Sequence, residues 1–108
     1  IVISGDHLTM QSDFFDLEEG QEYDKKVVNL IINPAVEPQN TNRIYSTFDL
    51  YPTTLAALGA EIEGDRLALG TNLFSNEEAL IEKYGLECVN DELMKTSKFY
   101  NNNILVEK

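Results

Sequence analysis

Cysteine and positive charge are both scarce in this chain. Cys88 is the only cysteine, which excludes an internal disulfide and a cysteine-based zinc site. The 8 basic residues are outnumbered by 19 acidic ones, and the formal net charge is −11 at pH 7. Because so acidic a surface repels phosphate backbones, the composition argues against a nucleic-acid partner.

Long apolar runs are also missing. No stretch approaches the roughly 20 apolar residues that a membrane-spanning helix needs. Asp6 interrupts the apolar run at the N-terminus, so no signal peptide is indicated. The chain itself is therefore predicted to be soluble.

Apolar residues nevertheless make up 43% of the 108 positions, which is enough for a modest core in one domain or part of one. Residues 1–4 and 27–32 are rich in Ile and Val, as is typical of strands buried on both faces, and Asn33-Pro34 ends the second run. Two such strands followed by helices predict an α/β fold, with a mostly parallel or mixed sheet covered by helices.

A helix is predicted near 47–58, because Ser46 or Thr47 can cap it, its apolar residues share one face, and Gly59 can stop it. Two further helices are predicted, one opened by a Ser-x-x-Glu capping box at 75–78 and ending at Gly85, and one from Asn90 to about residue 101. Three segments have weaker patterns: 13–24 fits a short helix or an ordered loop, 60–74 is irregular, and 104–106 fits a terminal strand or a frayed tail.

The residues with the clearest chemical potential are Asp6 and His7, directly after the first strand. A turn at the end of a strand can bring both side chains to one cation, and a carboxylate with an imidazole suits zinc, manganese or iron better than magnesium. Two ligands are too few for any of these ions. The alternative is an Asp that caps backbone amides beside a surface His.

Other reactive side chains have simpler interpretations. Thr9 and Ser12 are more typical of loop hydroxyls that bond to the local backbone than of nucleophiles. Arg43 and Arg66 could meet an anion, but nothing in the sequence names a partner for them. Cys88 is expected to be a small buried residue rather than a reactive thiol.

Four short motifs, in this order and spacing, resemble the alkaline phosphatase/sulfatase superfamily. The run Ile1–His7 resembles a strand that carries a pair of metal ligands, and Val28–Pro34 resembles the strand that follows it. Residues Arg43–Gly59 resemble the superfamily's segment of Asp, Pro-Thr, a short helix and Gly, and Gly70–Leu73 resembles the Gly-x-x-Leu after it. The chain is most similar to the phosphoglycerol and phosphoethanolamine transferases, including lipoteichoic acid synthases, which carry Asp-His where many sulfatases carry Asp-Asn.

The resemblance implies that residues 1–108 are the C-terminal portion of a sulfatase-like catalytic domain, a fragment of an alkaline phosphatase-like sheet with helical cover. It implies that Asp6 and His7 bind a divalent ion, manganese or zinc rather than magnesium. It also implies that the nucleophile, a Thr that forms a covalent intermediate with a phospholipid headgroup, lies upstream. The parent protein would be membrane-anchored, with its catalytic domain outside the cytoplasm.

Two other functions remain open from the sequence. The parent could be a sulfatase or a phosphodiesterase of the same superfamily, or the chain could be a non-catalytic packing or interaction module. With two ligands and no nucleophile, the 108-residue chain is expected to be inactive alone. The apolar strands 1–4 and 27–32 are expected to pack against the upstream half of the domain, and to self-associate without it.

Overall fold

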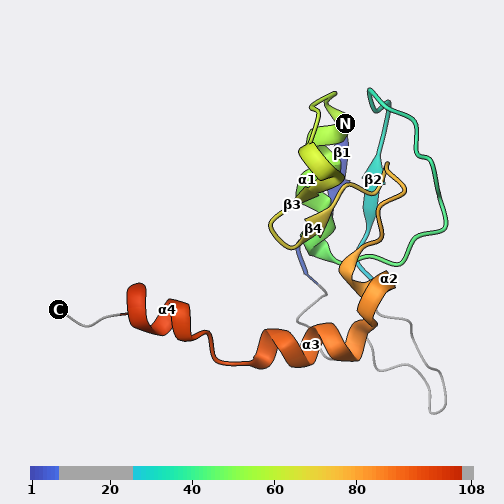
Figure 1. Ribbon diagram of the computed structural model, residues 1–108. Coiled ribbons are helices and arrows are strands. Elements are labelled where there is room, and N and C mark those ends of the chain that lie inside the picture. Colours follow the sequence, from blue (N-terminus) through green and yellow to red (C-terminus); the bar gives the residue numbers. More distant parts are fainter. Residues whose placement is uncertain (8–25, 106–108) are drawn as a thin grey trace, which may run out of the picture.

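The computed structural model describes residues 1–7 and 26–105 (Figure 1). It is a mixed α/β structure. Its elements are β1 (Val2–Ser4), β2 (Asn29–Ile31), the 3₁₀ helix η2 (Thr47–Asp49), α1 (Leu50–Ala57), the 3₁₀ helix η3 (Glu63–Asp65), β3 (Arg66–Leu67), β4 (Gly70–Thr71), α2 (Leu80–Tyr84), α3 (Leu86–Met94) and α4 (Lys98–Asn103). The predicted helix or loop at 13–24 lies outside the described residues.

Strands β1 and β2 form a two-stranded antiparallel sheet, with Ile3 opposite Leu30 and Ser4 opposite Asn29. The ladder continues past the strands, because the Gly5 N–H donates to the Val28 carbonyl at 2.8 Å. Both strands were correctly predicted, but two expectations are wrong for the described strands. They pair antiparallel instead of forming a mostly parallel or mixed sheet, and they are largely exposed instead of buried on both faces. Their continuous apolar pattern, which also suits a parallel sheet, reflects two faces that are apolar and still largely exposed.

The predicted helix at 47–58 is confirmed as η2 followed by α1. Ser46 stands at its N-cap position, and the Ser46 N–H donates to Asp49 Oδ2 at 2.8 Å. Pro52 is tolerated because it is the third residue of α1, where its missing N–H breaks no helical hydrogen bond. Gly59 ends the helix with a φ of 89°, a left-handed conformation that glycine adopts without strain.

Residues 60–74 were expected to be irregular, but they contain η3 and the antiparallel hairpin β3–β4. The hairpin lies against α1 and brings Thr71 and Phe74 into the interior. The small core contains Ala56, Ala57 and Phe74, with Ile31 and Ile62 packed against it. Because this core contains so few side chains, polar contacts carry much of the organisation around it.

The C-terminal helices differ from the prediction. Ser75 does not open α2, because its hydroxyl bonds locally to the Asn72 carbonyl and the Glu77 N–H. The helix starts after Ala79, whose N–H donates to Glu82 Oε2 at 2.8 Å. Gly85 ends α2 as predicted, whereas Asn90 lies inside α3 and does not cap a helix.

Helix α4 is capped instead by Ser97, whose hydroxyl accepts from the Tyr100 N–H at 3.1 Å. After α4, Ile104 and Leu105 are not in a strand, and residue 106 lies outside the described part of the chain. Helices α3 and α4 lead away from the rest of the structure as an arm (Figure 1). Within residues 1–7 and 26–105, no helix is long and apolar enough to cross a membrane.

Candidate functional site

Asp6 and His7 follow Gly5 at the end of β1, where the chain leaves the sheet. The His7 N–H donates to Asp6 Oδ1 at 2.9 Å, which turns the carboxylate back toward the imidazole. His7 Nε2 lies 3.6 Å from Asp6 Oδ2, and the two side chains are 58% and 87% exposed. The turn therefore brings the two side chains together instead of pointing them to opposite sides.

This spacing fits two ligands of one metal ion. Two atoms that each lie about 2.1 Å from a tetrahedral ion are about 3.4 Å apart, close to the observed separation of 3.6 Å. It equally fits an exposed ion pair between neighbours. No cluster of three or more His, Cys, Asp or Glu side chains that could hold a metal occurs among the described residues.

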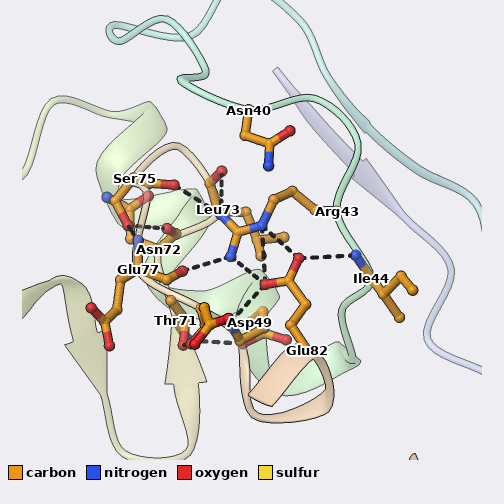
Figure 2. Close-up of polar contacts among 12 residues, drawn as sticks. Asn40, Arg43, Ile44, Asp49, Thr71, Asn72, Leu73, Ser75, Glu77 and Glu82 are labelled. Carbon is orange, nitrogen blue, oxygen red and sulfur yellow. Dashed lines mark hydrogen bonds and ion pairs between the residues drawn. The ribbon is translucent and has the colours of Figure 1, made fainter. Parts of the chain in front are cut away.

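A second polar cluster is centred on Arg43 and Glu82, which approach from opposite sides in Figure 2. Arg43 Nε and Nη2 both donate to the Glu82 carboxylate, at 2.8 and 2.7 Å. The guanidinium also donates to the carbonyls of Ser75 and Glu77, at 2.8 and 2.6 Å. The two side chains are only 6% and 19% exposed. Arg43 is thus committed to internal acceptors, and the anion that it meets is the Glu82 carboxylate.

The Glu82 carboxylate also accepts several hydrogen bonds. Besides the guanidinium, it accepts the N–H of Ile44 at 3.2 Å and the N–H of Ala79 at 2.8 Å. The hydrogen bonds from Arg43, aided by these two N–H groups, lower the pKa of Glu82 to about 2 despite partial burial. The hydrogen bond to Glu82 likewise raises the pKa of Arg43. The pair therefore joins the segment before η2 to the start of α2 and is structural.

A third cluster joins η2 and α1 to strand β4. Asp49 is almost fully buried, and its Oδ1 accepts the Thr71 N–H at 2.8 Å (Figure 2). Thr53 Oγ1 accepts the Leu73 N–H at 3.0 Å and donates to the Thr71 carbonyl at 3.4 Å. These residues belong to two of the motifs that resemble the sulfatase superfamily. In this chain they join η2 and α1 to β4, and Thr53 and Leu73 also line a pocket beside β2.

The remaining sequence candidates have different outcomes. Thr9 and Ser12 lie outside the described residues. Arg66 forms a more exposed ion pair with Glu77, with 2.8 Å between Arg66 Nη2 and Glu77 Oε1. Cys88 is exposed on α3, so the prediction that it is buried was wrong. The preceding α2 is short and α3 lies in the arm, which leaves little around Cys88 to cover it.

The sequence did not reveal a cavity of about 540 Å³ between β2 and the start of η2. Asn29, Tyr45 and Ser46 are among its polar lining residues, and Ile44 and Leu50 are among its apolar ones. One signal could have pointed to it. Asn29 is the single polar residue within the apolar run 27–32, and a polar side chain in such a strand calls for a partner.

Comparison of this chain with protein-family models, curated proteins and solved structures finds no match. Any functional conclusion must therefore depend on the chain's own residues.

Proposed function

We propose that this chain is the C-terminal portion of a metal-dependent, sulfatase-like phosphotransferase, in which Asp6 and His7 hold a divalent ion. The observation that carries the proposal is the convergence of the two side chains at the end of β1, with 3.6 Å between His7 Nε2 and Asp6 Oδ2. A carboxylate oxygen with an imidazole nitrogen favours manganese or zinc over magnesium. Further ligands would come from the rest of the domain.

The proposed reaction transfers a phosphoglycerol or phosphoethanolamine headgroup through a covalent Thr intermediate, with the Thr supplied upstream. When bound, the ion would supply positive charge to a phosphoryl oxygen. Asp6 would contribute negative charge that favours the cation, and the His7 N–H bond to Asp6 would keep the carboxylate oriented. The parent protein would be anchored in a membrane with this domain outside the cytoplasm.

Asp6→Ala should remove the metal-dependent signal from the end of β1. In the 108-residue chain, substoichiometric Mn²⁺ should broaden the NMR resonances of Gly5, His7 and Val28 first, because paramagnetic relaxation falls steeply with distance. In the variant we expect the apparent Mn²⁺ affinity that this local broadening reports to fall by at least about tenfold, since one of two ligands is lost. Broadening spread over the acidic surface, or unchanged by the substitution, would contradict the proposal.

Asp91→Ala is the matched control, because Asp91 is an exposed carboxylate on α3 and the substitution removes the same charge. It should leave the Mn²⁺ effect at Gly5 unchanged. A zinc titration followed by the His7 ring carbons gives a second readout that does not depend on catalysis.

We also propose that the β1–β2 sheet is covered by the rest of the domain in the whole protein, and by a second copy in the isolated chain. The sheet has only two strands in the described residues, and Ile3 and Leu30 are exposed on it. Two strands alone are marginally stable in water, and an open apolar edge pairs readily with another strand.

Ile3→Lys is therefore expected to shift the isolated chain toward monomer, because a charged residue on an edge strand opposes edge-to-edge pairing. Light scattering across a concentration series provides the measurement. Met94→Lys adds the same charge at an exposed position of α3 and serves as the control. A wild-type chain that is monomeric at every concentration would rule out self-association.

A further inference from the structure

A groove of about 260 Å³ lies between the C-terminal end of α1 and the segment 36–39. Its apolar lining includes Val36, Ile62 and Phe74. Phe74 belongs to the small core and Ile62 packs against it, so the groove opens onto that core. The groove is smaller than the roughly 300–1,000 Å³ of ordinary small-molecule sites, which suits a side chain of another segment better than a whole ligand.

Carboxylates surround this apolar lining. Glu37, Glu61 and Asp65 all line the groove. Asp65 Oδ1 accepts from Asn72 Nδ2 at 2.8 Å. The Glu37 and Glu61 side chains are exposed and form no hydrogen bond or ion pair with the described residues. A segment that enters the groove should therefore present an apolar side chain with a cation beside it.

Helix α4, at the end of the arm, has this combination of side chains. Phe99 and Tyr100 are 71% and 45% exposed, and Lys98 directly precedes them. The segment 95–105 contains two lysines and no acidic residue, in a chain of net charge −11. Lys95 is paired with Glu92, whereas Lys98 has no ion-pair partner among the described residues. The helix therefore complements the groove in both polarity and charge.

The groove and α4 lie in different parts of the described structure. The groove is built around the end of α1, and Figure 1 shows α4 well away from α1. The connection between α3 and α4 is residues 95–97, which span at most about 11 Å. Helix α4 is thus held at the end of α3, and the groove that it can occupy belongs to a second copy.

We propose that α4 of one copy docks into this groove of a second copy. Phe99 enters the groove against Phe74. Lys98 lies beside Glu37 and Glu61. In a two-fold dimer the contact forms twice, because each copy offers both its helix and its groove. Only a few side chains enter each groove, so the dimer should be weak and transient. The contact uses neither the β1–β2 sheet nor a metal ion.

Paramagnetic relaxation between two chains tests where the arm binds. A Cys88→Ser chain that carries a spin label on Asn102→Cys is mixed with an isotope-labelled Cys88→Ser chain. Both chains also carry Ile3→Lys, so that pairing between β1–β2 sheets plays no part. Backbone amides of the groove, such as that of Ile62, should broaden first and more strongly than those of β1.

Charge reversal tests the ion pairs of the contact. Lys98→Glu should raise the dissociation constant of the dimer at least about tenfold, because like charges then face each other in both contacts. Sedimentation across a concentration series provides the measurement. Adding Glu37→Lys and Glu61→Lys restores opposite charges and should restore association. Adding Glu87→Lys and Asp91→Lys instead changes the net charge equally on α3 and should not.

Three results would overturn the arm contact. The first is broadening that misses the groove or is unchanged by Lys98→Glu. The second is association that returns equally with the α3 control, since net charge alone would then explain it. The third is a chain that stays monomeric at every concentration, which would assign α4 and the groove to other partners. The metal proposal is separable, because the Mn²⁺ effect at Gly5 does not depend on this contact.

Discussion

Replacing Arg43 by Met should lower the free energy of unfolding by about 3 kcal/mol or more. The substitution leaves the poorly exposed Glu82 carboxylate without its guanidinium, and breaking a buried ion pair by removing one partner costs about 3–5 kcal/mol. It also removes the donors to the carbonyls of Ser75 and Glu77. Because small domains are stable by only about 5–15 kcal/mol, urea unfolding followed by circular dichroism should show the loss clearly.

The same ion pair makes stability depend on acidity in a defined direction. Folding lowers the pKa of Glu82 from 4.5 to about 2, chiefly through the hydrogen bonds from Arg43. The stabilisation is therefore complete above pH 4.5 and is lost as the pH falls toward 2, with a total of about 3 kcal/mol. Glu82→Gln should flatten the stability profile across this interval relative to the wild type.

Arg66→Met supplies the matched control for Arg43→Met. Arg66 also pairs with a glutamate at 2.8 Å, but its side chain is 31% exposed and that of Glu77 is 47% exposed. Exposed ion pairs contribute about 0–1 kcal/mol, so this variant should remain close to the wild type. Equal losses in the two variants would show that the Arg43 cluster is no more important than a surface pair.

The helix at 47–57 was predictable because its signals are local. Ser46 and Asp49 are three residues apart, Pro52 lies in the first turn of α1, and Gly59 ends the helix. Strands β1 and β2 were also visible as short apolar runs. Their antiparallel pairing was not, because an apolar run does not encode the direction of its neighbour.

The Arg43–Glu82 pair could not be predicted, because its members are 39 positions apart and each resembles an ordinary surface charge. The prediction of where α2 starts was wrong for a related reason. Ser75 has the right spacing from Glu78 for a capping box, but tertiary structure uses its hydroxyl to bond Asn72 and Glu77. Glu82, seven positions after Ser75, takes the capping role at Ala79.

The candidate site likewise has one part that could be predicted from the sequence and one part that could not. Asp6 and His7 were identified from the sequence, and their convergence depends only on the local turn after Gly5. The cavity at Asn29 depends on β2 and the segment before η2 coming together, which sequence spacing does not show. The motif residues Asp49, Thr53 and Gly70 hold the described fold together, and the resemblance to the sulfatase superfamily stays a prediction. The proposed chemistry depends on Asp6 and His7 alone.

Strand β4 passes unusually close to η2 at Gly70. A Cβ placed on Gly70 would lie 2.1 Å from the Phe48 carbonyl oxygen and 3.0 Å from Pro52 Cγ. The first of these neighbours is backbone, so it cannot rotate away as a flexible side chain would. This close approach is what lets the adjacent Thr71 N–H reach the buried carboxylate of Asp49 at 2.8 Å.

Gly70→Ala should therefore destabilise the chain by more than about 3 kcal/mol, at the upper end of overpacking effects, since relieving the clash must separate β4 from η2 and break the Asp49–Thr71 bond. Amide hydrogen exchange at Thr71 and Leu73 should accelerate more than exchange in α3. Gly64→Ala is the control, because Gly64 has a φ of 67° but open space around its Cβ, so only backbone strain of about 1 kcal/mol is added. If the two variants were equally stable, the approach of β4 to η2 would not be what requires glycine at position 70.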